Sequence, residues 1–581
     1  MQIYLVGGAV RDQLLGLPVK ERDWVVVGAT PQQMLDKGYR QVGKDFPVFL
    51  HPKTQDEYAL ARTERKTGPG YKGFSCYAAP DVTLEDDLLR RDLTINAMAQ
   101  DKQGNIIDPY GGRQDIEKRL LRHVSPAFAE DPVRILRIAR FAARYAPSGF
   151  TVAEETLQLM QKMVRAGEVN ALVIERVWQE LQKVLTEKQP QRFFEELRAC
   201  GALKILFPEI DNLFGVPAPP QWHPEVDTGI HTLLVLKRAA QLSQEGMVRF
   251  AALVHDLGKG LTAPHLWPKH HGHDEMGVAP IKNLCRRYRA PKDYQELAVL
   301  VSRYHTLCHK VFEIKPSTVL KLLEQLDAYR RPQRFQGFLL ACQADAQGRT
   351  GFEQKPYPQA NYLLTLYRQT ATITAEKFIA QGLQGLAIKQ ALYRERLRAI
   401  KRLLKDRIAL VPYDTHWPQL AQAEIALLKQ ALPYDWLIDI QHVGSTAIAG
   451  LAAKPIIDLY VGVSSVQKAL QAVKSLEALG YQFWQDNPNP EKLFFVKNMP
   501  PFGRKRTHHI HIVNYNSDYW RARLLFRDYL QTHAEEAKRY EQLKQRAMLE
   551  YFFDREQYTN SKYEFVAEIL KKAGFKDEVR R

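Results

Sequence analysis

The apolar and polar positions of the first 220 residues follow two different periods. Up to about residue 125, short runs rich in β-branched and aromatic side chains are broken by Gly, Pro and Asp, which is typical of strands in an α/β domain. These runs are QIYLVGG, DWVVVGA, FPVFLH and EYALAR. From EDPVRILRIARFAARY onward, apolar positions recur with the helical period. We therefore predict an α/β head over residues 1–125 and a helical neck and body over residues 126–222.

The helical period resumes after a proline-rich break, FGVPAPPQWHPEVD, and continues to about residue 405. Strand patterns then return in IIDLYVGV, FFVKN and HHIHIV, and a charged helical segment follows them. These shifts predict an all-α domain over residues 223–405 and a second, smaller α/β domain over residues 406–581. The expected fold class is multidomain, combining two α/β units with an all-α region.

Charge and cysteine usage narrow the class of protein. Lys and Arg outnumber Asp and Glu by 82 to 65, and the formal net charge of +17 favours polyanionic partners, above all nucleic acid. The five cysteines are far apart and form no CxxC pair, which excludes a disulfide framework and a thiolate metal site. No apolar run reaches the roughly 18 residues of a membrane span. We expect a cytoplasmic protein without membrane contact, as a monomer or a homodimer.

The stretch LVGGAVRDQLLG places two glycines between an apolar strand and a helix. Glycines at such a turn let backbone N–H groups approach phosphate oxygens, and Arg11 follows within one helical turn. Glu21 and Asp23 come two residues apart at the next strand, so both are expected on one face of it. A carboxylate pair is what a Mg²⁺ site for nucleotidyl transfer requires, although most Gly-Gly pairs are only turns.

The segment EDPVRILRIARFAARY carries an unusual arginine pattern. On a helix, the four arginines fall within about a third of the circumference, with Ile and Ala opposite. These are Arg134, Arg137, Arg140 and Arg144. An ordinary solvent face mixes both signs of charge, so an all-arginine face indicates an anion site. A solvated basic face is the alternative.

Six segments along the first 200 residues carry a family resemblance. They are LVGGAVRD, RDWVVVG, RRDLTINAMA, DPYGGRQDI, EDPVRILRIARFAARY and ERVWQEL. Their types and order resemble the motifs of the class II CCA-adding enzymes, the tRNA nucleotidyltransferases. The resemblance implies a nucleotidyltransferase-type head in which Glu21 and Asp23 hold the catalytic Mg²⁺. The family usually has Asp where this chain has Glu21, whose extra methylene changes the geometry of the site.

The same resemblance implies how the incoming nucleotide is bound. Contacts to it are expected from Gly8, Arg11, Arg91, Arg137 and Arg140. Asp131 and Arg134 match the pair that reads the Watson–Crick edges of CTP and ATP. A carboxylate and a guanidinium one helical turn apart offer acceptors and donors together, so protein side chains can select C and A without a nucleic-acid template.

The middle region contains His231, the adjacent pair His255 and Asp256, and Asp345. A lone His-Asp pair is more often a packed histidine beside a helix cap, but the full set resembles the HD phosphohydrolase superfamily. That resemblance implies a divalent metal (Mg²⁺, Mn²⁺, Ni²⁺ or Co²⁺) and 2′,3′-cyclic phosphodiesterase, 2′-nucleotidase and phosphatase activities. Further candidates for this site, or simply members of a solvated loop, are His270, His271, His273 and His305.

The C-terminal segments VPYDTHWPQL, HVGSTAIAGLAAKPIIDLYV, HHIHIV and LLFRDYL resemble the GrpB family. The resemblance implies a nucleotidyltransferase-like domain with Gly444 and Ser445 in a phosphate turn and Asp458 as a metal carboxylate. Tyr460 stands where a second acid would be needed, so a distant acid or nucleotide binding alone are both open. A basic string is a candidate for phosphate or RNA, or else only a loop leading into a strand: Arg504, Lys505, Arg506, His508, His509 and His511.

The resemblances together imply an enzyme that adds CCA to the 3′ end of tRNA from CTP and ATP and hydrolyses phosphoesters at a second metal site. The expected partners are tRNA and the two nucleotides. Two alternatives stand beside this interpretation: a poly(A) polymerase built on the same head, and a tRNA-binding quality-control protein whose head is inactive.

Overall fold

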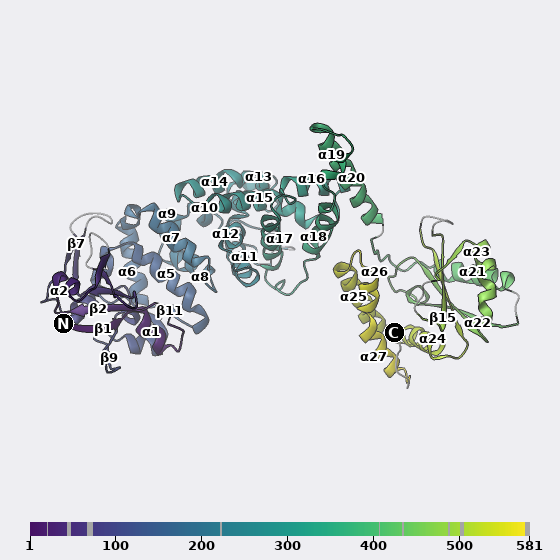
Figure 1. The fold of residues 1–581 in the computed structure, drawn as a ribbon, viewed down its shortest axis with the longest axis horizontal. Coiled ribbons are helices and arrows are strands. Elements are labelled where there is room, and N and C mark those ends of the chain that lie inside the picture. The colour runs from purple at the N-terminus through teal and green to yellow at the C-terminus, as the bar shows by residue number, and fades with distance from the viewer. Residues whose placement is uncertain are drawn as a thin grey trace. The chain divides into compact units, whose positions relative to one another are not determined.

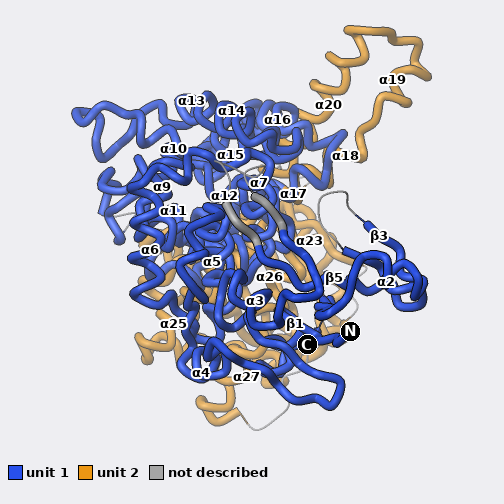
Figure 2. Tube along the Cα trace, turned by 90° about the vertical axis from the view of Figure 1, so that its left-hand side faces the viewer, with its two compact units in different colours: residues 1–363 blue, residues 364–581 orange. Residues whose placement is uncertain are grey.

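The computed structural model contains two compact units, residues 1–363 and 364–581 (Figure 2). The described residues are 1–19, 21–42, 48–66, 74–220, 224–405, 407–432, 435–485, 489–499 and 505–575. The predicted fold class is confirmed, because a sheet-containing head, a long helical region and a second sheet-containing domain follow one another along the chain (Figure 1). Among the described residues, every helix is too short or too polar to cross a membrane.

The head is built on a seven-stranded sheet with the order β3-β4-β5-β2-β1-β8-β9. Its strands are β1 (Gln2–Val6), β2 (Asp23–Val27), β3 (Arg40–Val42), β4 (Val48–Leu50), β5 (Glu57–Leu60), β8 (Ala99–Gln100) and β9 (Ile106–Ile107). A separate antiparallel pair is formed by β6 (Thr63–Lys66) and β7 (Phe74–Tyr77). The helices are α1 (Gly8–Leu14), α2 (Pro31–Asp36), α3 (Leu84–Leu89) and α4 (Gly112–Lys118). Asp23 pairs with Val6, so the first acid of β2 lies beside the glycine turn that leaves β1.

Helices form the rest of the first unit. The neck and body contain α5 (Val133–Tyr145), α6 (Glu154–Arg165), α7 (Ile174–Val184), α8 (Gln191–Ala199), α9 (Ala202–Leu206) and α10 (Pro208–Asp211), with the short parallel strands β10 (Leu120–Leu121) and β11 (Thr151–Val152). The following region contains α11 (Thr228–Leu242), α12 (Gly246–Val254), α13 (His273–Met276), α14 (Val278–Arg287), α15 (Lys292–His309), α16 (Pro316–Gln325) and α17 (Pro332–Gln347). The apolar helix α12 packs against α11, α15 and α17 and forms the centre of this region.

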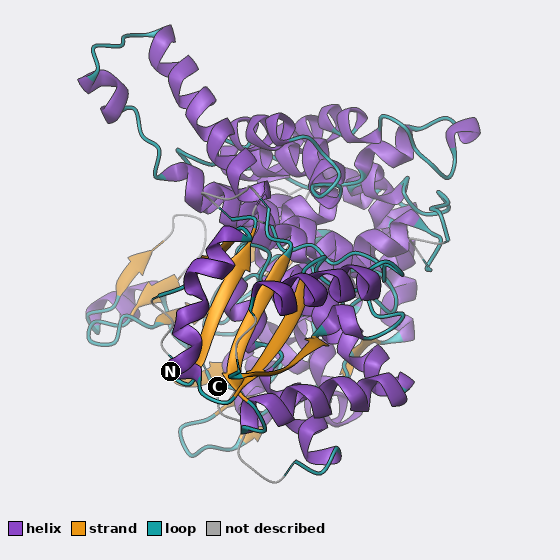
Figure 3. Ribbon diagram, turned by 90° about the vertical axis from the view of Figure 1, so that its right-hand side faces the viewer, coloured by secondary structure: helices purple, strands orange, loops and turns teal. Residues whose placement is uncertain are grey.

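The C-terminal domain has a five-stranded sheet with the order β12-β13-β16-β15-β14, in which only the β13–β16 pair is parallel among the described strands (Figure 3). The strands are β12 (Leu437–Val443), β13 (Ile457–Val463), β14 (Tyr481–Phe483), β15 (Lys492–Lys497) and β16 (His508–Asn514). Three helices precede this domain: α18 (Pro358–Ala371), which crosses the unit boundary, α19 (Glu376–Ala380) and α20 (Leu386–Lys405). The helices of the domain are α21 (Trp417–Ala431), α22 (Val466–Ala469), α23 (Val473–Ala478), α24 (Asp518–Thr532), α25 (Ala534–Glu550), α26 (Arg555–Asn560) and α27 (Tyr563–Lys572). Residues of α21 and the sheet share one apolar core.

One buried arginine connects the body to the helical region behind it. Arg249 lies in the middle of α12, is 1% exposed and donates hydrogen bonds to backbone carbonyl oxygens from two other segments. The acceptors are Leu185 (2.9 Å) and Glu187 (2.7 Å) after α7, and Ala240 (3.1 Å) and Ser243 (2.7 Å) at the end of α11. A buried carbonyl needs a donor, so this one guanidinium satisfies several groups at the junction.

We expect Arg249→Met to lower the free energy of unfolding of the first unit by about 3 kcal/mol, because each buried acceptor left without a donor costs about 1–3 kcal/mol. Hydrogen exchange should show lost protection beginning at the ends of α7 and α11. The exposed Arg286→Met in the same region is the control. An equal loss in both variants would contradict the role given to the Arg249 hydrogen bonds.

Candidate functional site

A polar cleft with a volume of about 860 Å³ lies between the head and the body of the first unit. Nine residues singled out from the sequence line it: Gly8, Arg11, Glu21, Asp23, Arg91, Asp131, Arg134, Arg137 and Arg140. These residues come from α1, the start of β2 and the segment before it, the loop after α3, and α5 with its preceding residues. The fold therefore gathers the whole predicted set around one space.

The glycine turn lets an arginine approach the backbone. Gly7 has a φ of +71°, and a Cβ at this position would lie 2.8 Å from Nη1 of Arg91. Arg11, in the helix that follows, is 4% exposed and donates to the side chains of Asp12 and Asn96. Its guanidinium also lies 5.2 Å from the ring centroid of Tyr145 in α5. Both arginines are thus held beside the turn by neighbouring side chains.

The two candidate acids occupy different backbone environments. The sequence suggested one strand for both, but β2 begins at Asp23, so Glu21 precedes the strand. Both side chains nevertheless line the cleft. Removal from water raises the pKa of Asp23, Arg91 opposes that rise, and Glu21 adds to it. Two acids close enough to repel, with oxygen atoms facing a cavity, form a set that suits Mg²⁺.

The arginine face of α5 is not a solvated basic surface. Arg134 and Arg140 are 9% and 8% exposed, and their helix is flanked by acids from other elements. Nε of Arg140 donates to Oε2 of Glu180 at 2.6 Å, and Nε of Arg137 donates to Oδ2 of Asp92 at 2.7 Å. The acids that α5 itself lacks are therefore supplied by neighbouring elements.

Asp92 is a buried partner that the sequence analysis missed. Burial alone would raise the pKa of Asp92, but Arg137 and a hydrogen bond from Asn96 hold it below its ordinary value. A charged Asp92 fixes the Arg137 guanidinium at the cleft wall. The signal was present in the sequence, because Asp92 and Asn96 both lie in the motif RRDLTINAMA.

Arg176 is a second residue that the sequence analysis missed, and it orients Asp131 of the predicted base-reading pair. Arg176 of α7 donates to both carboxylate oxygens of Asp131, at 3.1 and 2.8 Å. Arg134 donates to the carbonyl oxygens of Ala127 and Arg90, at 3.1 and 2.6 Å. Both members of the pair are therefore oriented before any ligand binds. Arg176 belongs to the motif ERVWQEL, but only the fold shows that it faces Asp131.

The predicted His and Asp set of the middle region also comes together. Nε2 of His231 in α11 lies 3.2 Å from Oδ1 of Asp345 in α17. Nε2 of His255, which follows α12, lies 3.2 Å from Oδ2 of Asp256 and 3.6 Å from Oδ1 of Asp345. All four side chains are buried. His231, His255 and Asp256 each offer a donor atom within 4.8 Å of the others, so these three can reach one ion, and Asp345 contacts both imidazoles.

Of the four further candidate histidines, two belong to this cluster and two do not. Nε2 of His273 and Nε2 of His305 lie 3.4 and 3.5 Å from Oδ1 of Asp256, so both join the cluster. His270 does not, because its ring contacts the hydroxyl of Thr262 and a backbone carbonyl. His271 is exposed. One member was missed by the sequence analysis: His309, whose Nε2 lies 2.6 Å from Oδ2 of Asp345.

Electrostatics indicate that this cluster is built around a cation. Burial would lower the pKa of His255, but the carboxylates of Asp256 and Asp345 raise it to about 10. Nε2 of His255 and Oδ1 of Asp256 are buried without a well-aligned hydrogen bond among the described residues. A divalent ion would satisfy these atoms and the local negative charge together.

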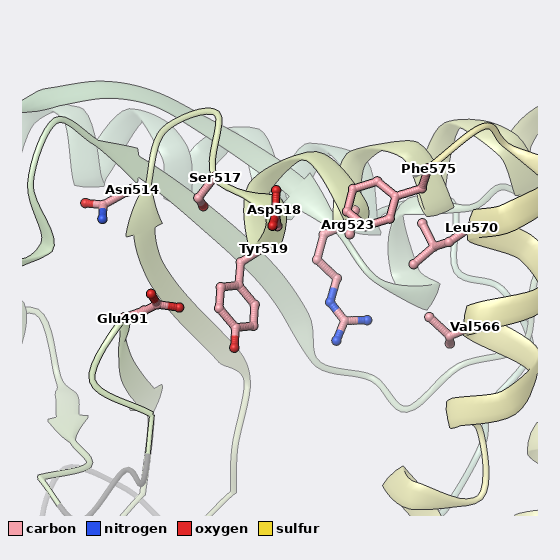
Figure 4. Close-up of a pocket in the computed structure, with 10 residues that line it drawn as sticks. Glu491, Asn514, Ser517, Asp518, Tyr519, Arg523, Val566, Leu570 and Phe575 are labelled. Atoms are coloured by element: carbon pink, nitrogen blue, oxygen red, sulfur yellow. The ribbon is translucent and has the colours of Figure 1, made fainter. Parts of the chain in front are cut away.

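The candidate residues of the C-terminal domain line a separate cavity of about 840 Å³, which includes Gly444, Ser445 and Asp458. Within the predicted basic string, Arg506, His509 and His511 line it as well. His508 faces Glu424 instead, Lys505 lines another cavity, and Arg504 lies outside the described residues. A smaller cavity of about 280 Å³ shares Arg523 with it and has an apolar wall of Val566, Leu570 and Phe575 (Figure 4).

Four protein-family models match the chain. Residues 3–122 match the "Poly A polymerase head domain", residues 149–214 the "Probable RNA and SrmB- binding site of polymerase A", residues 228–331 the "HD domain" and residues 407–572 the "GrpB protein". The matches follow one another in the order of the regions described above.

Full-length relatives match the N-terminal part. The multifunctional CCA protein of Thioalkalivibrio sulfidiphilus is 64% identical over 403 residues, which cover 69% of this chain and 98% of that protein. The multifunctional CCA protein of Nitrosococcus oceani is 64% identical over 402 residues, with the same shares. A solved apo structure of a CCA-adding enzyme is 22% identical with a TM-score of 0.49, covering 69% of this chain and 88% of that chain.

Proposed function

This chain belongs to the multifunctional CCA proteins, and from that premise we propose which residues carry each of its two chemistries. The protein adds CCA to the 3′ end of tRNA from CTP and ATP, and it hydrolyses phosphoesters in its HD region. The observation that supports the first assignment is the convergence of nine predicted residues on one cleft. Because these substrates are cytoplasmic, we place the protein there.

Nucleotidyl transfer joins the 3′ oxygen of the RNA to the α-phosphorus of the nucleotide and breaks the bond from that phosphorus to the bridging oxygen, releasing pyrophosphate. The triphosphate needs cations around it, which we assign to Arg11, Arg91 and Arg137 beside the glycine turn. Glu21 and Asp23 offer the carboxylate oxygens for Mg²⁺, which when bound activates the 3′ hydroxyl and neutralises developing charge.

Base selection is assigned to Asp131 and Arg134. The exocyclic amino groups of C and A are donors, which the Asp131 carboxylate can accept, and the adjacent ring nitrogens are acceptors for the Arg134 guanidinium. G and U present the opposite groups at these positions and are rejected. Arg176 acts as a positioning residue, because its two hydrogen bonds fix the plane of the Asp131 carboxylate.

Hydrolysis is assigned to the buried cluster of α11, α12 and α17. We propose that His231, His255, Asp256 and Asp345 hold a divalent ion, which when bound activates a water for attack on a phosphoester. Lys259, whose Nζ lies 2.6 Å from Oδ2 of Asp256, orients that carboxylate. The proposed substrates are 2′,3′-cyclic phosphates, 2′-nucleotides and phosphomonoesters, and the ion is Mg²⁺, Mn²⁺, Ni²⁺ or Co²⁺.

The direct test is extension of tRNA lacking its 3′ end, with Mg²⁺ and CTP, ATP or both, read as product length on a sequencing gel. We expect two additions with CTP and a third only when ATP is also present. A ladder with ATP alone would indicate a poly(A) polymerase. No extension under any condition would indicate a tRNA-binding protein with an inactive head.

The two chemistries should separate by mutation. Asp23→Asn removes a carboxylate charge from the cleft and should reduce CCA addition at least 100-fold, while hydrolysis of a 2′,3′-cyclic nucleotide stays within twofold of wild type. His255→Ala should give the reverse pattern. Loss of both activities in either properly folded variant would argue for one shared site.

Arg176→Met should relax nucleotide choice, because the Asp131 carboxylate loses the fork that fixes its plane. We expect kcat/KM for CTP to fall about tenfold, equivalent to about 1.4 kcal/mol, with a smaller change for UTP. The exposed Arg198→Met in the same body is the matched control. An unchanged ratio of CTP to UTP incorporation would remove Arg176 from base selection.

A further inference from the structure

The cavity of the C-terminal domain is strongly cationic. Seven lysine and arginine side chains line it, against the two carboxylates of Asp458 and Glu556. Three of these lysines are brought together from different segments, Lys454 before β13, Lys544 in α25 and Lys562 before α27. The cavity of about 840 Å³ is large enough for a nucleotide.

Lys544 is buried, and Lys454 and Lys562 are partly buried. Burial, together with the neighbouring charge of Lys562, lowers the pKa of Lys454 and of Lys544 to about 7. Nζ of Lys454 and Nζ of Lys562 lie 3.9 and 4.3 Å from the ring centroid of Tyr558. Within the described part of the chain, none of these three lysines forms an ion pair. Buried charges are normally paired, so an anion in this cavity would compensate the three lysines.

A second and independent feature lies on the wall of the same cavity. Asp458 of β13 and His509 of β16 are register partners, and His511 follows on the same face of β16. One donor atom from each lies within 4.8 Å of the others. Nδ1 of His509 contacts Oδ1 of Asp458 at 3.0 Å. Nε2 of His509 and Nδ1 of His511 are buried and have no hydrogen-bond partner among the described residues.

The candidate metal ligands here differ from the two carboxylates of the head. Tyr460 occupies the position two residues after Asp458, and its ring lies 4.9 Å from the ring of His511. No second strand carboxylate is therefore available here for a two-metal Mg²⁺ arrangement. Two imidazoles with one carboxylate favour a transition-metal ion such as Mn²⁺ or Zn²⁺ over Mg²⁺.

The cavity also has a backbone turn and an aromatic wall. Gly444 has a φ of +74°, and a Cβ there would lie 2.6 Å from Oδ2 of Asp458, so only glycine brings this turn against the carboxylate. Phe494 packs on His511 with ring centroids 4.8 Å apart, and Trp484 meets Phe494 at 5.5 Å. Trp484 is 51% exposed, which leaves an indole face available for stacking on a base.

We propose that the C-terminal domain binds a nucleoside triphosphate together with one transition-metal ion, held by Asp458, His509 and His511. The phosphates occupy the space between the metal and the lysines Lys454, Lys544 and Lys562. The base lies against Trp484. Its residues differ from those of the nucleotide cleft and from those of the HD cluster, the buried set of His231, His255, Asp256 and Asp345.

The test measures how many Mn²⁺ ions and how many ATP molecules bind to the 581-residue chain. Mn²⁺ binding is followed by electron paramagnetic resonance of the free ion, and ATP binding by equilibrium dialysis in the presence of Mn²⁺. His511→Gln should remove one equivalent of bound Mn²⁺, and Lys544→Met with Lys562→Met should weaken one ATP site at least tenfold. The controls are the exposed His416→Gln and Lys468→Met in the same domain.

CCA addition and the unfolding temperature are measured on each variant. Wild-type CCA addition with one lost equivalent of metal or nucleotide supports the proposal, and it separates this site from the failure of either N-terminal assignment. Unchanged metal and ATP stoichiometry in folded variants would overturn it. Inorganic tripolyphosphate binding as tightly as ATP would overturn the nucleoside part, and AMP binding as tightly as ATP would overturn the phosphate part.

Discussion

Burial of arginine charge is the constraint on which the catalytic half of this molecule depends. The cleft must concentrate cations for a triphosphate, yet buried guanidinium groups are unfavourable unless acids accompany them. The protein places those acids on other elements, as Asp92 beside Arg137 and Glu180 beside Arg140. Each pair joins α5 to a neighbouring element, so the charges that prepare the substrate site also hold head, neck and body in one unit.

The three candidate sites differ in how their charges are compensated. In the cleft, arginines are paired internally and still line the space, which fixes their direction. In the HD cluster, carboxylates and imidazoles face each other with unsatisfied buried atoms, as expected where a cation belongs. In the C-terminal cavity, seven lysine and arginine side chains face only two carboxylates, which is expected where an anion belongs. Where neighbouring side chains neutralise the charges, the site is already ordered without its ligand. Where they do not, the ligand supplies the missing charge.

Sequence patterns predicted the elements well, because strand and helix periods are local. The runs containing Val25 and Ile138 became β2 and α5. Long-range partners were missed, since nothing near Arg137 in the sequence indicates Asp92, and nothing near Asp131 indicates Arg176. His309 was missed for the same reason, as it meets Asp345 only when α15 packs against α17. The roles of Asp92, Arg176 and His309 are predictions, whereas their contacts with Arg137, Asp131 and Asp345 are properties of the fold.

Glu21 illustrates why position in the fold matters more than side-chain length. An acid within a strand ladder has a fixed backbone, so an added methylene moves its oxygens by a full bond. Glu21 instead precedes β2, whose pairing with β1 begins at Asp23. Its side chain is exposed and lines the cleft beside Asp23, so the longer side chain displaces no packed neighbour. The fold therefore tolerates Glu21 in place of the usual Asp. This substitution does not favour the alternative of an inactive head.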